Sequence, residues 1–141
     1  MIRDGARTLV EAYIARATAL EEQGKPWDGF LGFGSRPADD PCHTRMVDDL
    51  VTLLREGADS LAPGEARDIL ADLLEAPAAH SRCPAIYWTL IAAQGAGLTL
   101  MPRLTREEAE GLLRELDTLY PKRTRLPVQA LLVSALKKAA K

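Results

Sequence analysis

The sequence predicts an all-α protein, and three observations support this fold class. Alanine and leucine are abundant among the 141 residues, and both are among the best helix-forming residues. Apolar residues recur at steps of three and four, as on one face of a helix. Valine, isoleucine and threonine form no alternating runs of the kind that strands show. With 47% hydrophobic and 27% charged residues, the composition is typical of a globular domain, so we expect a single domain over residues 1–141.

The first helix is expected over residues 1–23, where an apolar stripe begins at Ile2 and is followed by glycine and proline. Residues 24–40 then form a segment rich in glycine and proline that nevertheless contains three large aromatic residues. An irregular segment of this length is uncommon in a compact domain and often has a function. Its aromatic side chains could pack onto the core or anchor a partner protein. These residues are Trp27, Phe30 and Phe33.

Five further helices are expected over residues 41–141. The second, fourth and sixth each begin at a proline, which suits a first helical turn because the N–H that it lacks would have no partner there. The third begins near Pro63 and carries apolar and acidic residues on opposite faces. The fifth begins at Thr105 and Glu108, whose spacing predicts a capping box. Short loops should place neighbouring helices antiparallel. The three helix-opening prolines are Pro41, Pro84 and Pro127.

These three prolines are spaced 43 residues apart. The same shift superimposes apolar positions of the intervening helices, for example Ile69 on Leu112 and Leu73 on Leu116. A period near 43 residues with two helices per unit lies in the range of HEAT and armadillo repeats. We therefore predict a short repeat of this type over residues 41–141. The alternative is an ordinary bundle, since similar helices joined by short loops also give a rough period.

Both cysteines and both histidines lie in two pairs near predicted helix starts. A structural zinc ion takes four ligands of these types, and the spacing of His80 and Cys83 suits one. The adjacent Cys42 and His43 point apart, however, and could reach one metal only with a strained backbone. We predict no metal and no cofactor. A metal- or thiol-dependent enzyme built on these four residues is kept as an alternative. Reduced thiols and the lack of a signal peptide predict a cytoplasmic protein.

Charge is distributed unevenly along the chain: residues 1–60 carry a net charge of −4 and residues 101–141 carry +4. The basic C-terminal segment could contact phosphates, although it has few aromatic residues on which bases could stack. Nucleic-acid binding there is a second alternative function. Residues 83–102 contain no charge, but glutamine, glycine and proline interrupt them, so we expect a buried helix that ends at glycine rather than a membrane span.

The function predicted from these observations is that of a non-catalytic protein-binding module. No catalytic motif of high specificity occurs, and small helical stacks present grooves to partner proteins. The partner is expected to be a charged protein, because complementary charge speeds association. A cognate inhibitor of the immunity or antitoxin type would be one concrete form. The residues predicted to bind the partner are Trp27, Phe30, Phe33, Asp39, Asp40, Lys122, Arg123 and Arg125.

Overall fold

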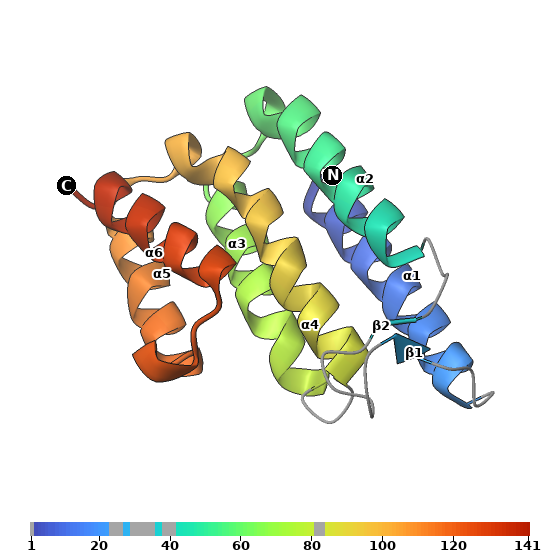
Figure 1. The fold of residues 1–141 in the computed structure, drawn as a ribbon. Coiled ribbons are helices and arrows are strands. Elements are labelled where there is room, and N and C mark those ends of the chain that lie inside the picture. The colour runs from blue at the N-terminus through green and yellow to red at the C-terminus, as the bar shows by residue number, and fades with distance from the viewer. Residues whose placement is uncertain (1, 23–26, 29–35, 38–41, 81–83) are drawn as a thin grey trace.

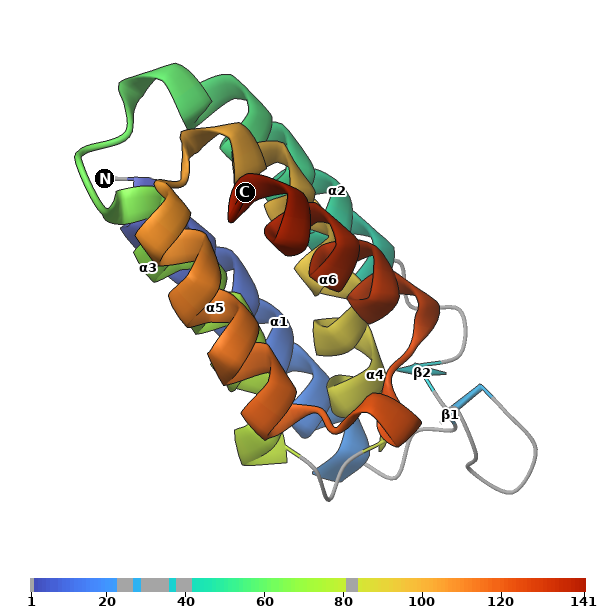
Figure 2. The ribbon, with the colours of Figure 1, turned by 90° about the vertical axis from the view of Figure 1, so that its left-hand side faces the viewer.

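The chain folds into helices packed in two layers, which confirms the all-α fold class (Figures 1 and 2). A computed structural model describes residues 2–22, 27–28, 36–37, 42–80 and 84–141, with the backbone alone at Trp88 and at residues that border the gaps. The described residues form six α-helices: α1 (Ile2–Glu22), α2 (Cys42–Gly57), α3 (Glu65–Glu75), α4 (Pro84–Ala93), α5 (Arg106–Leu119) and α6 (Pro127–Ala139).

One layer contains α1, α3 and α5, and the other contains α2, α4 and α6 (Figure 2). Successive helices run antiparallel, as predicted (Figure 1). Within the first layer α3 contacts both α1 and α5, and across the layers α1 packs on α2 and α5 packs on α6. Apolar side chains from all six helices form the core between the layers. A stack of helix pairs would have this arrangement, but the 43-residue repeat itself stays a prediction.

Local sequence signals set several helix ends. At the start of α5 the Glu108 N–H donates to Thr105 Oγ1 at 3.1 Å, and the Thr105 N–H donates to Glu108 Oε1 at 2.9 Å, so the predicted capping box is present. At the start of α3 the Ala62 N–H donates to Glu65 Oε1 at 3.0 Å. Glu65 and Glu108 therefore bind the backbone in the same way at positions related by the predicted period.

The α-helix α4 ends at Ala93, just before the glycines at which an end is predicted, but the chain stays helical beyond it. It continues from α4 as a ten-residue 3₁₀ helix, Gln94–Arg103, which is long for this type of helix. Gly95 and Gly97 lie within it, and a Cβ atom at Gly97 would collide with the Leu70 side chain of α3. A Cβ atom at Gly95 would lie 3.2 Å from Val128 Cγ2 of α6. These glycines thus follow the end of α4 directly and also allow the 3₁₀ helix to pack closely against α3 and α6.

A two-residue strand pair lies within the segment expected to be irregular. Its strands are β1 (Trp27–Asp28) and β2 (Arg36–Pro37), which pair antiparallel with Trp27 opposite Pro37. The sequence has no alternating apolar pattern at this place. A pair of two-residue strands does not require such a pattern, because it is formed by backbone hydrogen bonds. In the described part of the chain, no helix is long and apolar enough to cross a membrane.

Candidate functional site

A groove of about 320 Å³ lies between α1 and the end of α3, two helices that are neighbours in the same layer (Figure 2). The more buried residues of its lining are apolar, and the more exposed ones are mainly ionisable. Its principal apolar residues are Ala6, Val10, Ile14, Ile69, Leu73 and Ala76. The ionisable residues, which we call the rim, are Arg7, Glu11, Asp72, Glu75 and His80.

Helical periodicity explains why the groove exists. Ala6, Val10 and Ile14 recur every four residues and form one row along α1. Ile69 and Leu73 form the corresponding row on α3, and the chain continues into a 3₁₀ turn over Ala76–His80. Several lining residues are alanines, whose small side chains leave space between the two rows. The groove is therefore a consequence of residue size at positions where the two helices face each other.

A charged cluster connects α1 to α3 at the groove. Arg3 Nε donates to Asp72 Oδ2 at 2.8 Å, and Arg7 Nε donates to the same oxygen at 3.1 Å. Burial alone would raise the pKa of Asp72, but the hydrogen bonds from the two guanidinium groups outweigh it and lower this pKa. The hydrogen bond to Asp72 in turn raises the pKa of Arg3. Asp72 is thus held as a carboxylate that already has two cationic partners.

Glu65 makes a second connection between α1 and α3. Its side chain is 7% exposed, and its Oε2 accepts a hydrogen bond from the Arg3 N–H at 3.2 Å. Its Oε1 accepts the Ala62 N–H described above. Both oxygens bind backbone donors at the start of a helix, where backbone N–H groups need partners. We therefore assign Glu65 a structural role.

The rim is rich in carboxylates where α3 ends. Glu115 of α5 lies beside Glu75, and burial raises the pKa of the Glu115 carboxyl. A hydrogen bond with Glu75 and the negative charge of Glu75 raise it further, while the positive charge of Arg67 opposes the change. Two carboxylates thus stand close together beside the end of α3. This side of the groove therefore has a negative potential.

A buried polar network lies apart from the groove, where α3, α5, α6 and the 3₁₀ helix meet. Tyr120 Oη donates to the Leu74 carbonyl at 2.5 Å, and Gln94 Nε2 lies 3.3 Å from the same hydroxyl. Gln129 Nε2 donates to Gln94 Oε1 at 3.3 Å. Burial raises the pKa of Tyr120 to about 12. Since all its members are paired, the network stabilises the helix packing and is not a reactive site. Sequence reasoning missed it, although Gln94 in an uncharged run was a signal.

The two cysteines and two histidines were predicted as alternative metal ligands or catalytic residues. Cys83 lies outside the described residues, and so do the side chains of Cys42 and His43 at the start of α2. His80 ends the 3₁₀ turn after α3 and contributes to the groove. Among the described residues, no three histidine, cysteine or acidic side chains could hold a metal ion together. The metal or thiol enzyme therefore stays an alternative prediction.

Most of the predicted partner-binding residues in the first 40 positions are not described. Phe30, Phe33, Asp39 and Asp40 lie outside the described residues, and only the backbone of Trp27 is described, in β1. Their role stays a prediction.

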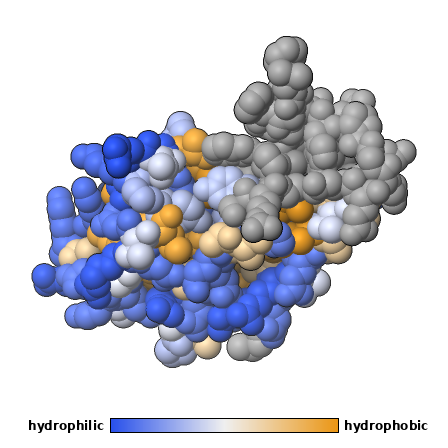
Figure 3. Space-filling model, turned by 90° about the horizontal axis from the view of Figure 1, so that it is seen from below, coloured by the Kyte–Doolittle hydropathy of each residue, from blue (hydrophilic) through white to orange (hydrophobic). Residues whose placement is uncertain are grey.

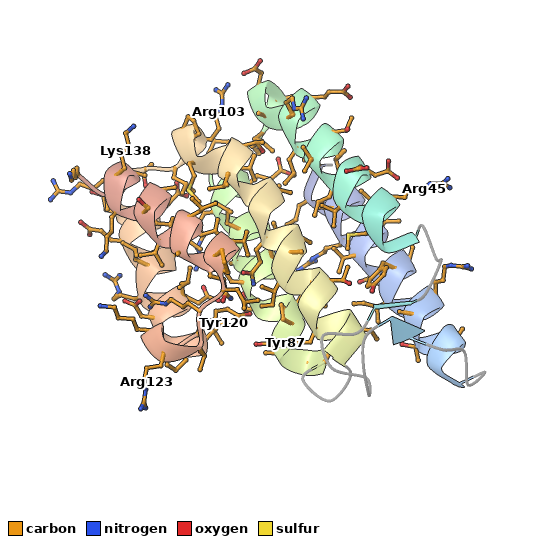
Figure 4. The ribbon with its side chains drawn as sticks, viewed as in Figure 1. Arg45, Tyr87, Arg103, Tyr120, Arg123 and Lys138 are labelled. Carbon is orange, nitrogen blue, oxygen red and sulfur yellow. The ribbon has the colours of Figure 1, made fainter. Side chains whose placement is uncertain are left out.

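The basic C-terminal residues lie in the described part of the chain. Arg125 Nε donates to the Tyr120 carbonyl at 3.0 Å, and its guanidinium pairs with Asp117. Lys122 and Arg123 are exposed. Arg123 and Lys138 point away from the helices near opposite ends of α6 (Figure 4). The 13 residues of α6 span about 20 Å, so these two cations are well separated.

The described surface carries few exposed apolar side chains. The face seen in Figure 3 is largely hydrophilic. Among the described residues, the one large apolar side chain that is exposed belongs to Leu131 of α6, which is 58% exposed. A single exposed leucine is ordinary in a soluble protein. A concave apolar surface such as the groove is more informative, because binding sites are usually of this form.

Comparison of the chain with protein families, curated proteins and solved structures finds no match. The fold and the groove define a small, two-layered helical domain with a candidate binding site between α1 and α3.

Proposed function

We propose that the chain is a non-catalytic protein-binding module and that its partner binds in the groove between α1 and α3. The observation that carries this proposal is the apolar lining of the groove, which runs along two parallel rows of side chains and has a charged rim. An apolar centre with a polar border is the usual composition of a protein–protein interface. A cognate inhibitor is one form that such a module could take.

The polar contacts that join α1 to α3 beside the groove favour binding over catalysis. Asp72 is neutralised by Arg3 and Arg7, and Glu65 is used by backbone N–H groups. Groups that are satisfied in this way hold the two helices at a fixed separation. A groove with rigid walls loses less conformational entropy when a partner binds, and this increases affinity.

Two alanines of the same 3₁₀ turn allow a matched test. Ala79 is exposed and lines the groove, whereas Ala78 is exposed and does not line it. A tryptophan at position 79 should fill the groove, while a tryptophan at position 78 adds the same side chain outside it. Both variants should fold, because neither alanine is buried.

The binding partner is to be captured from a lysate of the source cells, identified by mass spectrometry and purified. Its affinity is then measured by isothermal titration calorimetry. We expect Ala79→Trp to weaken binding about tenfold or more, as loss of a central contact does, and Ala78→Trp to leave it unchanged. Unchanged affinity in a folded Ala79→Trp variant would place the partner elsewhere. Stoichiometric zinc in the purified protein would instead favour the enzyme alternative.

A further inference from the structure

We infer that the groove accepts a basic amphipathic helix of the partner protein. One face of this helix would place apolar side chains on the α1 and α3 rows, and lysine or arginine residues beside that face would meet the carboxylates of the rim. This inference rests on the proposed function and adds the chemistry of the partner.

The charge of the rim favours a basic partner. The rim contains three carboxylates and one guanidinium group, so its net charge is −2 with His80 neutral, and Arg3, which bonds to Asp72 from outside the rim, reduces the net charge to −1. The single guanidinium, that of Arg7, is already bonded to Asp72. Glu11 on α1 and Glu75 at the end of α3 then stand on the two walls of the groove, and both are exposed. A cationic side chain above the groove could reach either wall.

A further carboxylate, which lies outside the rim, adds to this negative charge. Glu115 of α5 lies next to Glu75, and burial together with the proximity of Glu75 raises the pKa of Glu115. The neighbouring cation that opposes this effect is Arg67. A lysine or arginine of the partner placed beside Glu75 would relieve the repulsion between the two carboxylates. Binding of a basic segment would therefore be favoured by more than one carboxylate.

The shape of the groove favours a helix. Its apolar row on α1 extends from Ala6 to Ile14, which corresponds to about 12 Å, or slightly more than two helical turns. Two turns of an amphipathic helix present apolar anchors at positions i, i+3 or i+4, and i+7, which is the usual pattern of helix-in-groove recognition. The groove is thus long enough for three such anchors.

Two synthetic peptides can test the charge preference directly. Each is about 14 residues long, or four helical turns, and carries leucine at the anchor positions. The remaining positions are lysine in one peptide and glutamate in the other. Binding of the fluorescein-labelled peptides to the full chain is measured by fluorescence anisotropy at about 50 and 150 mM NaCl, since ionic contacts weaken as salt increases.

We expect the lysine peptide to bind about tenfold more tightly than the glutamate peptide, with a difference that narrows at the higher salt concentration. Glu11→Gln and Glu75→Gln should each weaken binding of the lysine peptide about threefold, as expected for an exposed ion pair. The matched control Glu56→Gln removes an exposed carboxylate from α2 in the other layer and should have no effect. Circular dichroism confirms that each variant is folded.

The outcomes separate this inference from the proposed function. If both peptides bind equally and Ala79→Trp blocks both, the groove is a binding site but its preference for basic helices is wrong. If neither peptide binds when the protein concentration is raised to about 100 μM, any affinity is weaker than that of a typical specific complex, and the inference is overturned. The proposed function is then still tested with the native partner. If the lysine peptide binds and Ala79→Trp has no effect, the groove is not its site and the inference is overturned, while the native partner still tests the proposed function.

Discussion

Gly97 illustrates how one residue determines the packing of two elements. It is buried in the 3₁₀ helix, where a Cβ atom would collide with Leu70 Cδ2 and would lie 3.6 Å from Leu73 Cδ1. The absence of a side chain therefore allows α3 to approach this segment closely. Gly111 in the middle of α5 differs, because a Cβ atom there would meet only Arg114 Nη2, at 3.9 Å.

We expect the same substitution to have opposite effects at these two glycines. Gly97→Ala should destabilise the protein by about 1–2 kcal/mol, since the cost of overpacking exceeds the gain from alanine's helix preference. Gly111→Ala should stabilise it by about 0.5–1 kcal/mol through that preference alone. Urea denaturation followed by circular dichroism measures both changes. An equally stable Gly97→Ala variant would show that Leu70 moves aside easily.

At the residue scale, sequence reasoning succeeded where interactions are local. The capping box joins Thr105 to Glu108, only three residues away, and its spacing alone predicted it. The buried network was not predicted, because Gln94 bonds to Tyr120 and Gln129, which are 26 and 35 residues away. Such contacts depend on helix placement, which single-residue patterns do not encode.

The ionic contact between helices α1 and α3 is also long-range. Asp72 binds Arg3 and Arg7, which precede it by 69 and 65 residues. Its carboxyl side chain is 26% exposed, so solvent only partly screens the interaction. The position of α1, and with it the width of the groove, therefore depends in part on the ionisation of one side chain.

We expect Asp72→Asn to reduce stability in a pH-dependent way. The pKa of Asp72 is lowered from its usual 3.8 in the folded protein, so its contribution is fully present above that value. It is lost as the pH falls through the lower folded-state pKa. The variant should therefore be less stable by about 1 kcal/mol at pH 7 and should approach the unsubstituted protein near pH 2.

Thermal unfolding between pH 2 and pH 7 measures this difference. The matched control is Asp48→Asn, which removes an exposed carboxylate from α2 and should change stability by less than about 0.5 kcal/mol. A loss in Asp72→Asn that is the same at both ends of the pH range would mean that the side chain contributes by packing and not by charge.

At the scale of elements, the starts of the helices were easier to predict than their ends. Pro84 and Pro127 begin α4 and α6 as predicted, because proline at a first turn has a direct local cause. α4 ends at Ala93, next to the glycines that predicted its end, but the 3₁₀ helix that follows was not predicted, because glycine also permits close packing and the sequence alone does not distinguish these roles. The groove could not be predicted for a related reason: it exists only once α1 and α3 are side by side.

At the scale of the whole molecule, α3 and the 3₁₀ helix Gln94–Arg103 form the central helix pair. In the first layer α3 lies between α1 and α5, and in the second the 3₁₀ helix contacts both α2 and α6. Almost fully buried residues occur in this central pair, including Ile69 and Leu100, and also on the inner faces of the outer helices, including Leu50 and Leu116. The outer helices are covered on fewer sides, so their local opening exposes less apolar surface and should require less free energy.

We therefore expect native-state hydrogen exchange to be slowest at the centre of the molecule. Amides of α3 and of Gln94–Arg103 should exchange about tenfold more slowly than those of α1 and α6, which corresponds to about 1.4 kcal/mol in opening free energy. Mass spectrometry of peptic fragments measures the rates. One common rate in all six helices would show that opening is global and would contradict a stack in which the outer pairs open first.

Two variants test whether the buried network of Gln94, Tyr120 and Gln129 contributes to slow exchange in the central helix pair. Gln129→Leu removes the donor to Gln94 and leaves a buried oxygen without a partner, which costs about 1–3 kcal/mol. It should speed exchange in the central pair, because the network joins the 3₁₀ helix to α6. Leu131→Ala on the same helix alters a side chain that is 58% exposed and should leave the central rates unchanged. If both variants changed the central rates equally, the protection would arise from α6 as a whole and the network would have no special role.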